Sequence, residues 1–187
     1  MVAGHTGSVG GHFLQKISRL TDGLNLVVSW IVGLFLAISS AAVFAQVLIR
    51  FVLPSFGIIV AAPWTEEISR YLIIWVVFLG VAVLCRNFRL IAVEILALMV
   101  PRPIGNAFKF FSIAVSLCFF ALTASIGLSW TQMSAIELSP VMRFPMNWVY
   151  FAMPVGSLLA IFNLLVLAAE AMTGQRDLLE AHPDAED

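Results

Sequence analysis

The stretch that decides the fold reads Trp64-Thr65-Glu66-Glu67-Ile68-Ser69-Arg70-Tyr71 and then continues without another charge to Cys85. Two adjacent carboxylates therefore stand at the start of an apolar segment. A helix that begins at Thr65 places Glu66 four residues before Arg70, the favourable order for an ion pair, and puts both carboxylates near the positive end of the helix dipole. About 22 residues at about 1.5 Å of rise each cross a hydrocarbon core of about 30 Å.

The composition is that of an integral membrane protein. Of the 187 residues, 61% are hydrophobic and only 11% are charged, whereas soluble domains carry about 25% charged residues. Mean hydropathy is +1.00. The formal net charge of −1 and the position of the basic residues at segment ends argue against nucleic acid as a partner. Membrane lipid is the expected surrounding.

Long uncharged stretches predict an all-α integral membrane protein with four transmembrane helices. The expected spans cover about residues 24–49, 65–86, 110–136 and 144–169. Together they form a membrane domain over residues 23–172. The apolar segment at about 90–100 is too short to span, so we expect a short interfacial helix between the second and third spans. Residues 1–22 are expected to be a cytoplasmic amino-terminal segment, and residues 173–187 an acidic cytoplasmic tail.

The distribution of Lys and Arg predicts the orientation. If the amino terminus is cytoplasmic, seven of the ten Lys and Arg residues face the cytoplasm, as the positive-inside rule requires. An even number of spans then places both termini on the cytoplasmic side. The three basic residues left on the external side are Arg50, Arg70 and Arg143. The external surface is expected to consist of the connection from Arg50 to Trp64 and the tight turn from Glu137 to Arg143.

The interiors of the predicted spans hold no ionisable side chain, and polar residues there are sparse. Because ionisable residues inside a membrane usually mark ion or proton paths, the sequence predicts no proton relay. The three histidines, His5, His12 and His182, lie in the polar termini, so no imidazole pair is placed to hold haem. We therefore expect no catalytic residue, no metal site and no cofactor.

Two patterns have both a functional and a structural interpretation. Small residues four apart in the fourth span permit close helix packing, either against another subunit or within this bundle. Glu66 and Glu67 fit either a carboxylate site or helix capping and ion pairing. Adjacent helix positions point about 100° apart, which favours structural pairing with one carboxylate free to face a partner. The partner-interface candidates are Trp64, Glu66, Glu67, Arg70, Gly80, Ala152, Gly156 and Ala160.

These residues resemble the small membrane subunit of TRAP transporters, the DctQ-like or Q subunit of tripartite ATP-independent periplasmic uptake systems. The run from Trp64 through Arg70-Tyr71 to Gly80 closely matches the family's signature stretch. Val93-Glu94 matches a Val-Asp pair of the family, although Leu90 stands where the family usually has His. The sequence Pro154-Val155-Gly156 is similar to the family's last helix.

The resemblance implies a non-catalytic scaffold for a large membrane transport subunit, which in the family carries the substrate and sodium sites. It also implies a bacterial or archaeal inner (plasma) membrane and a periplasmic substrate-binding protein that delivers a small organic acid. We expect Arg50, Glu137 and Arg143 to dock that binding protein, and Arg86 and Arg89 to bind lipid headgroups. The alternatives are an autonomous oligomeric channel or carrier and, less favoured by the sequence, a membrane oxidoreductase subunit.

Overall fold

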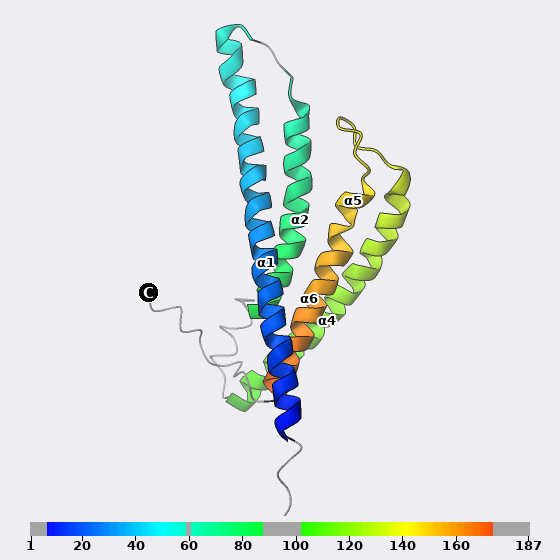
Figure 1. Ribbon diagram of the computed structural model, residues 1–187. Helices are drawn as coiled ribbons and strands as arrows, with labels where there is room; N and C mark the ends of the chain where they lie inside the picture. Colours follow the sequence, from blue (N-terminus) through cyan, green and yellow to red (C-terminus); the bar gives the residue numbers. More distant parts are fainter. Residues whose placement is uncertain (1–6, 59–60, 88–101, 174–187) are drawn as a thin grey trace, which may run out of the picture.

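The computed structural model describes residues 7–58, 61–87 and 102–173, which are helical apart from short connections (Figure 1). Four of the helices are long and apolar enough to cross a membrane. This finding confirms the predicted all-α fold with four spans. The predicted interfacial helix at 90–100 lies outside the described residues, as does the tail beyond Thr173.

Helix α1 (Gly7–Val47) is 41 residues long and begins well before the first predicted span. It continues as a π-helical turn, η1 (Leu48–Val52), and a 3-10 turn, η2 (Leu53–Phe56). Pro54 has no N–H to donate to the carbonyl of Arg50, so the regular α pattern cannot continue there. Gly57, with φ 78°, ends the helical segment. Arg50, expected in a loop, therefore lies on a helical turn.

Helix α2 (Pro63–Asn87) covers the second predicted span, and Pro63 occupies a position where its missing N–H costs nothing. Helix α4 (Arg102–Met133) ends in a 3-10 turn, η3 (Ser134–Ile136). The last span is interrupted at Phe151, between α5 (Asn147–Tyr150) and α6 (Ala152–Met172). Pro154 explains this interruption, because it cannot donate to the carbonyl of Tyr150.

The long helices pack in the order α1 on α2, α2 on α6 and α6 on α4. Helix α6 is central. In the most apolar stretch of the fourth span, half of the residues are buried within the chain, whereas in the first span only 11% are. The core cluster consists of Ala82, Cys85, Phe120, Ala160 and Leu164. Helix α1 is peripheral, and most of its apolar side chains face away from the bundle.

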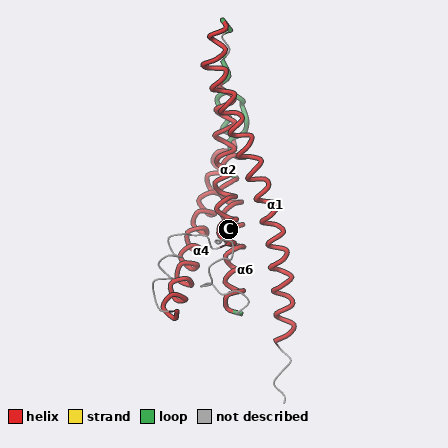
Figure 2. Tube along the Cα trace, turned by 90° about the vertical axis from the view of Figure 1, so that its left-hand side faces the viewer, coloured by secondary structure: helices red, strands yellow, loops and turns green. Residues whose placement is uncertain are grey.

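At the end predicted to be external, α1 with η1 and η2 extends well past the loop that joins η3 to α5, whereas α2 begins close to the level of that loop (Figures 1 and 2). This arrangement follows from the unequal helix lengths, since α1, η1 and η2 form an almost continuous rod whereas α4 stops at Met133. The outer end of this rod is therefore open to a neighbour on several sides.

Candidate functional site

The first turn of α2 carries an exposed ion pair at its outer end. Arg70 Nη2 donates to Glu66 Oε1 over 2.8 Å, and the two side chains are 69% and 58% exposed. The spacing predicted this contact. Gln46 of α1 lies within 3.5 Å of the other carboxylate oxygen of Glu66. Trp64 is also exposed, so Trp64, Glu66 and Arg70 remain accessible candidates for a partner interface.

Glu67 points the other way, into the protein, and is only 8% exposed. Its Oε1 accepts a hydrogen bond from the hydroxyl of Tyr71, and its Oε2 accepts one from the backbone N–H of Met142, each over 2.8 Å. The expectation that Glu67 faces a partner is therefore wrong. The carboxylate instead joins α2 to the external loop, a contact between residues 75 positions apart that sequence spacing does not indicate.

That loop, Glu137–Phe144, is a closed hairpin. Ser139 donates its N–H to the carbonyl of Phe144 over 2.9 Å, and Phe144 donates its own N–H to Ser139 Oγ over 3.2 Å. Met146 N–H donates to the carbonyl of Glu137 over 3.0 Å. Arg143 has φ 54°, the left-handed region, and its side chain is exposed. Arg50, Glu137 and Arg143 are all exposed, as docking residues would need to be.

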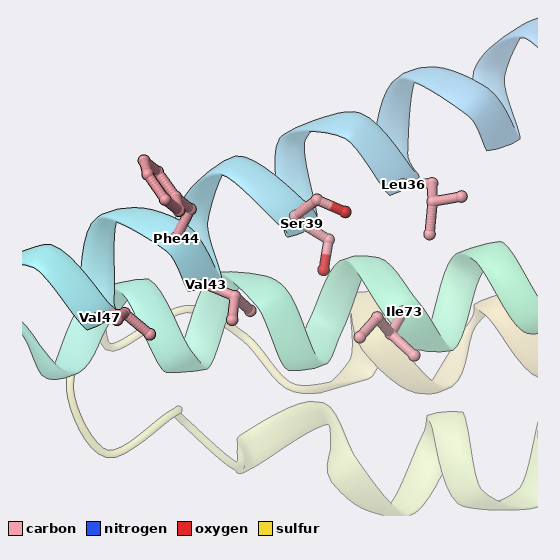
Figure 3. A pocket seen from close by; sticks show the side chains of 7 residues that line it. Leu36, Ser39, Val43, Phe44, Val47 and Ile73 are labelled. Atoms are coloured by element: carbon pink, nitrogen blue, oxygen red, sulfur yellow. The ribbon is translucent and has the colours of Figure 1, made fainter.

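A shallow apolar groove of about 400 Å³ lies between α1 and α2 (Figure 3). Leu36, Val43 and Val47 contribute from α1 and Ile73 from α2. Close by, Ser39 Oγ and Ser69 Oγ each lie 3.3 Å from the other residue's backbone carbonyl oxygen, so the two helices approach closely there. The groove thus lies where α1 and α2 meet, and most of the side chains that line it are apolar.

The small residues of the fourth span are used inside the bundle, which corrects their assignment to a partner interface. Ala152 and Ala160 are 0% exposed. A Cβ on Gly156 would lie 2.6 Å from Phe78 Cβ, closer than real contacts allow, so α6 meets the backbone of α2 at this glycine. Gly80 differs, since nothing lies within 4 Å of a Cβ built on it. It stays a partner candidate.

The opposite end of the bundle contains a buried ionic cluster. Arg86 Nη1 and Nη2 donate to the two carboxylate oxygens of Glu170 over 2.8 and 2.7 Å. Its Nε donates to Asp22 over 2.8 Å, and Nη2 reaches Ser18 Oγ at 3.0 Å. The side chains of Arg86 and Glu170 are 3% and 5% exposed. This cluster joins α1, α2 and α6.

One sequence expectation is corrected by this cluster. Arg86 was predicted to bind lipid headgroups, but its guanidinium is buried and bonded to carboxylates of its own chain. Arg86 is the last residue of the second span and Glu170 stands two residues before the end of the fourth, so the cluster lies at span ends and not in the span interiors. Arg89 lies outside the described residues.

An amide cluster lies one to two turns further into the bundle. The side chains of Asn25 and Asn163 donate to each other's oxygen over 2.8 Å, and Asn163 also donates to the carbonyl of Ala82 over 2.7 Å. Asn163 is 0% exposed. Asn25, Asp22 and Glu170 were not among the residues predicted from the sequence to have a role. Their position at span ends was the only available signal.

Comparison with known proteins assigns the family. The family model described as "Tripartite ATP-independent periplasmic transporters, DctQ component" matches residues 39–174, well over half of the chain. The chain belongs to the DctQ family. It is thus a small permease subunit of a TRAP transporter and a multi-pass membrane protein. No solved structure matches it.

The chain is also similar to curated proteins that are named TRAP transporter permeases. A putative TRAP transporter small permease protein of Haemophilus influenzae is 33% identical over 128 residues, which cover 66% of this DctQ-type chain and 74% of the relative. The C4-dicarboxylate TRAP transporter small permease protein DctQ of Vibrio cholerae is 21% identical over 200 residues, covering 94% and 82%. The isethionate TRAP transporter permease protein DctMQ of Oleidesulfovibrio alaskensis is 33% identical over 116 residues, covering 59% of this chain but only 18% of that longer protein.

Proposed function

We propose that this chain is a non-catalytic scaffold for a large membrane transport subunit, in a system that takes up a small organic acid with sodium. A periplasmic binding protein delivers the substrate. The observation that carries the proposal is that the buried polar side chains Arg86, Glu170, Asn25 and Asn163 bond to groups of their own chain. Such contacts hold α1, α2 and α6 in one arrangement, as a stationary support requires.

The face that this scaffold offers to the large subunit runs along α2. Five exposed residues and the half-buried Gly80 follow one another at intervals of four and three residues, the spacing with which one helix packs against another. This stripe consists of Glu66, Arg70, Ile73, Val77, Gly80 and Leu84. Gly80 leaves room for close approach by a neighbouring helix, and Ile73 borders the groove between α1 and α2. The match to a short part of a longer permease supports a large membrane partner.

Gly80→Leu tests this interface. The new side chain meets open space within the chain, so the isolated subunit should keep its thermal stability while co-purification with the large subunit falls. Ala121→Leu, on the exposed face of α4, is the matched control and should leave co-purification unchanged. If Gly80→Leu retained the complex in full, the α2 stripe would not be the interface.

The proposed topology places both termini in the cytoplasm and the protein in the inner membrane of a bacterium or archaeon. The excess of Lys and Arg on that side supports it. A cytoplasm-active reporter fused after Asp187 should be active, and a periplasm-active reporter at the same site should be silent. The reverse pattern would refute this orientation and with it the external position of the loop that contains Arg143.

A further inference from the structure

We propose that the loop Glu137–Phe144 is a preformed docking element, that its Arg143 binds an acidic site on the periplasmic binding protein, and that Glu67 positions it. This inference rests on the proposed function and on the proposed topology, in which the loop faces the periplasm. It names Arg143 as a contact residue for the binding protein. It also gives the buried carboxylate of Glu67 a role that the scaffold function by itself does not require.

Arg143 is held in a backbone conformation that its residue type does not favour. Its φ of 54° lies in the left-handed region, which glycine adopts readily, as Gly57 does in this chain. A residue with a side chain remains there only when the surrounding structure imposes the conformation, and such positions gather at functional sites. Glycine would form this turn more easily than arginine. We therefore attribute the arginine at this position to a function of its side chain.

Glu67 imposes that conformation from outside the loop. Its buried carboxylate accepts the N–H of Met142, the residue directly before Arg143, and Tyr71 fixes the other carboxylate oxygen. Within the loop, Ser139 closes the hairpin against Phe144. Met142 is thus anchored to α2 and Phe144 to the hairpin, one residue on each side of Arg143, which fixes the direction in which the Arg143 side chain leaves the loop.

The surface around Arg143 suits a protein partner with carboxylates. Val141, Met142 and Phe144 are each more than 40% exposed, and no carboxylate of the described residues forms an ion pair with Arg143. An arginine among exposed apolar side chains is typical of the residues that dominate protein interfaces. A rigid loop favours binding to a surface of fixed shape, because no ordering entropy is lost. A fluid lipid surface would gain little from such rigidity.

The test is the affinity of the two-subunit permease, in lipid nanodiscs, for the purified substrate-binding protein of the same transport system. Arg143→Ala should raise the dissociation constant about 10-fold at low salt and flatten its salt dependence. Glu67→Ala should raise it by a similar factor, and the double variant should be little worse than either single one, because both remove the same contact. Glu67→Gln keeps an acceptor for Met142 N–H and should restore most of the affinity.

Two features separate positioning from other effects. Removing a negative charge would strengthen attraction to an acidic partner, so weaker binding by Glu67→Ala cannot come from net charge. Gln132→Ala, at the exposed outer end of α4, is the control and should bind as well as the unmodified permease. Arg143→Gly should raise thermal stability while it weakens binding. If Arg143 served only to stabilise the loop, the same substitution would lower both thermal stability and affinity.

Three other outcomes of the binding experiment would contradict specific parts of the proposal. If the unmodified permease did not bind the substrate-binding protein, the proposed function and this inference would both fall. If it bound with salt-sensitive affinity that Arg143→Ala and Glu67→Ala left intact, only this inference would fall. If the loss with Arg143→Ala appeared only in discs with anionic lipid, the loop would bind the membrane and the proposed protein contact would be refuted.

Discussion

Replacing Glu170 by Ala should destabilise this protein more than any other single charge removal discussed here. The substitution leaves the guanidinium of Arg86, 3% exposed, without its two-point partner inside the bundle. Removing one member of a buried ion pair costs about 3–5 kcal/mol, since the remaining charge stays away from water. Asp22 and Ser18 continue to bond to Arg86, which places the expected loss in the free energy of unfolding near the lower limit, about 3 kcal/mol.

The matched control is Glu66→Ala, which breaks an ion pair with almost the same oxygen–nitrogen distance but with both side chains more than half exposed. Exposed pairs contribute about 0–1 kcal/mol. The double variant Arg86→Met with Glu170→Leu removes both charges of this buried pair and should regain most of the lost stability. Burial, not the presence of an ion pair, decides the size of the effect.

Denaturant titration in detergent, followed by circular dichroism, measures the free energy of unfolding of the unmodified subunit and of the three variants. The expected order is unmodified protein and double variant together, Glu66→Ala slightly below them, and Glu170→Ala well below. Equal losses for Glu170→Ala and Glu66→Ala would refute the assignment of the Arg86 cluster as a buried support. So would a double variant that is less stable than Glu170→Ala alone.

Three further outcomes test the packing by thermal unfolding and thiol labelling in detergent. Gly156→Ala should cost about 1–3 kcal/mol because its Cβ overlaps α2, and Gly80→Ala, with open space around it, should be neutral; equal stability of the two would contradict the α2–α6 contact. Asn163→Leu should cost about 1–2 kcal/mol by leaving buried partners unbonded, and an unchanged melting temperature would argue against that network. N-ethylmaleimide, an uncharged reagent that enters detergent micelles, should modify Cys118 on the outer face of α4 faster than the buried Cys85, whereas equal labelling rates would disprove this difference in burial.

The spans and the outer ion pair could be predicted because each depends on local sequence. Uncharged stretches of sufficient length can satisfy their backbone groups in lipid only as helices. Glu66 and Arg70 are four residues apart on one helix, so their contact needs no knowledge of the fold. The first helical segment is longer than the predicted span 24–49, because it continues past Arg50 and accommodates Pro54 by changing to π and 3-10 turns.

The contacts that hold the helices together could not be read from the sequence. Asp22, Arg86 and Glu170 each stand near the end of a span, where a charge normally meets water or lipid headgroups. Only the packing of α1, α2 and α6 brings the three side chains into one buried cluster. Gly156 presented a similar ambiguity, since its spacing fits either an outer or an inner face. The rotation of α6 about its axis decides the question, and Phe78 of α2 fills that face.

The central claim is that this chain supports transport and does not perform it. Proteoliposomes that contain this subunit alone, the large subunit alone or both should be given an inward sodium gradient, the substrate-binding protein and a radiolabelled organic acid. The account predicts accumulation with both subunits together and none with this subunit alone. Sodium-driven accumulation by vesicles that contain only this subunit would contradict it.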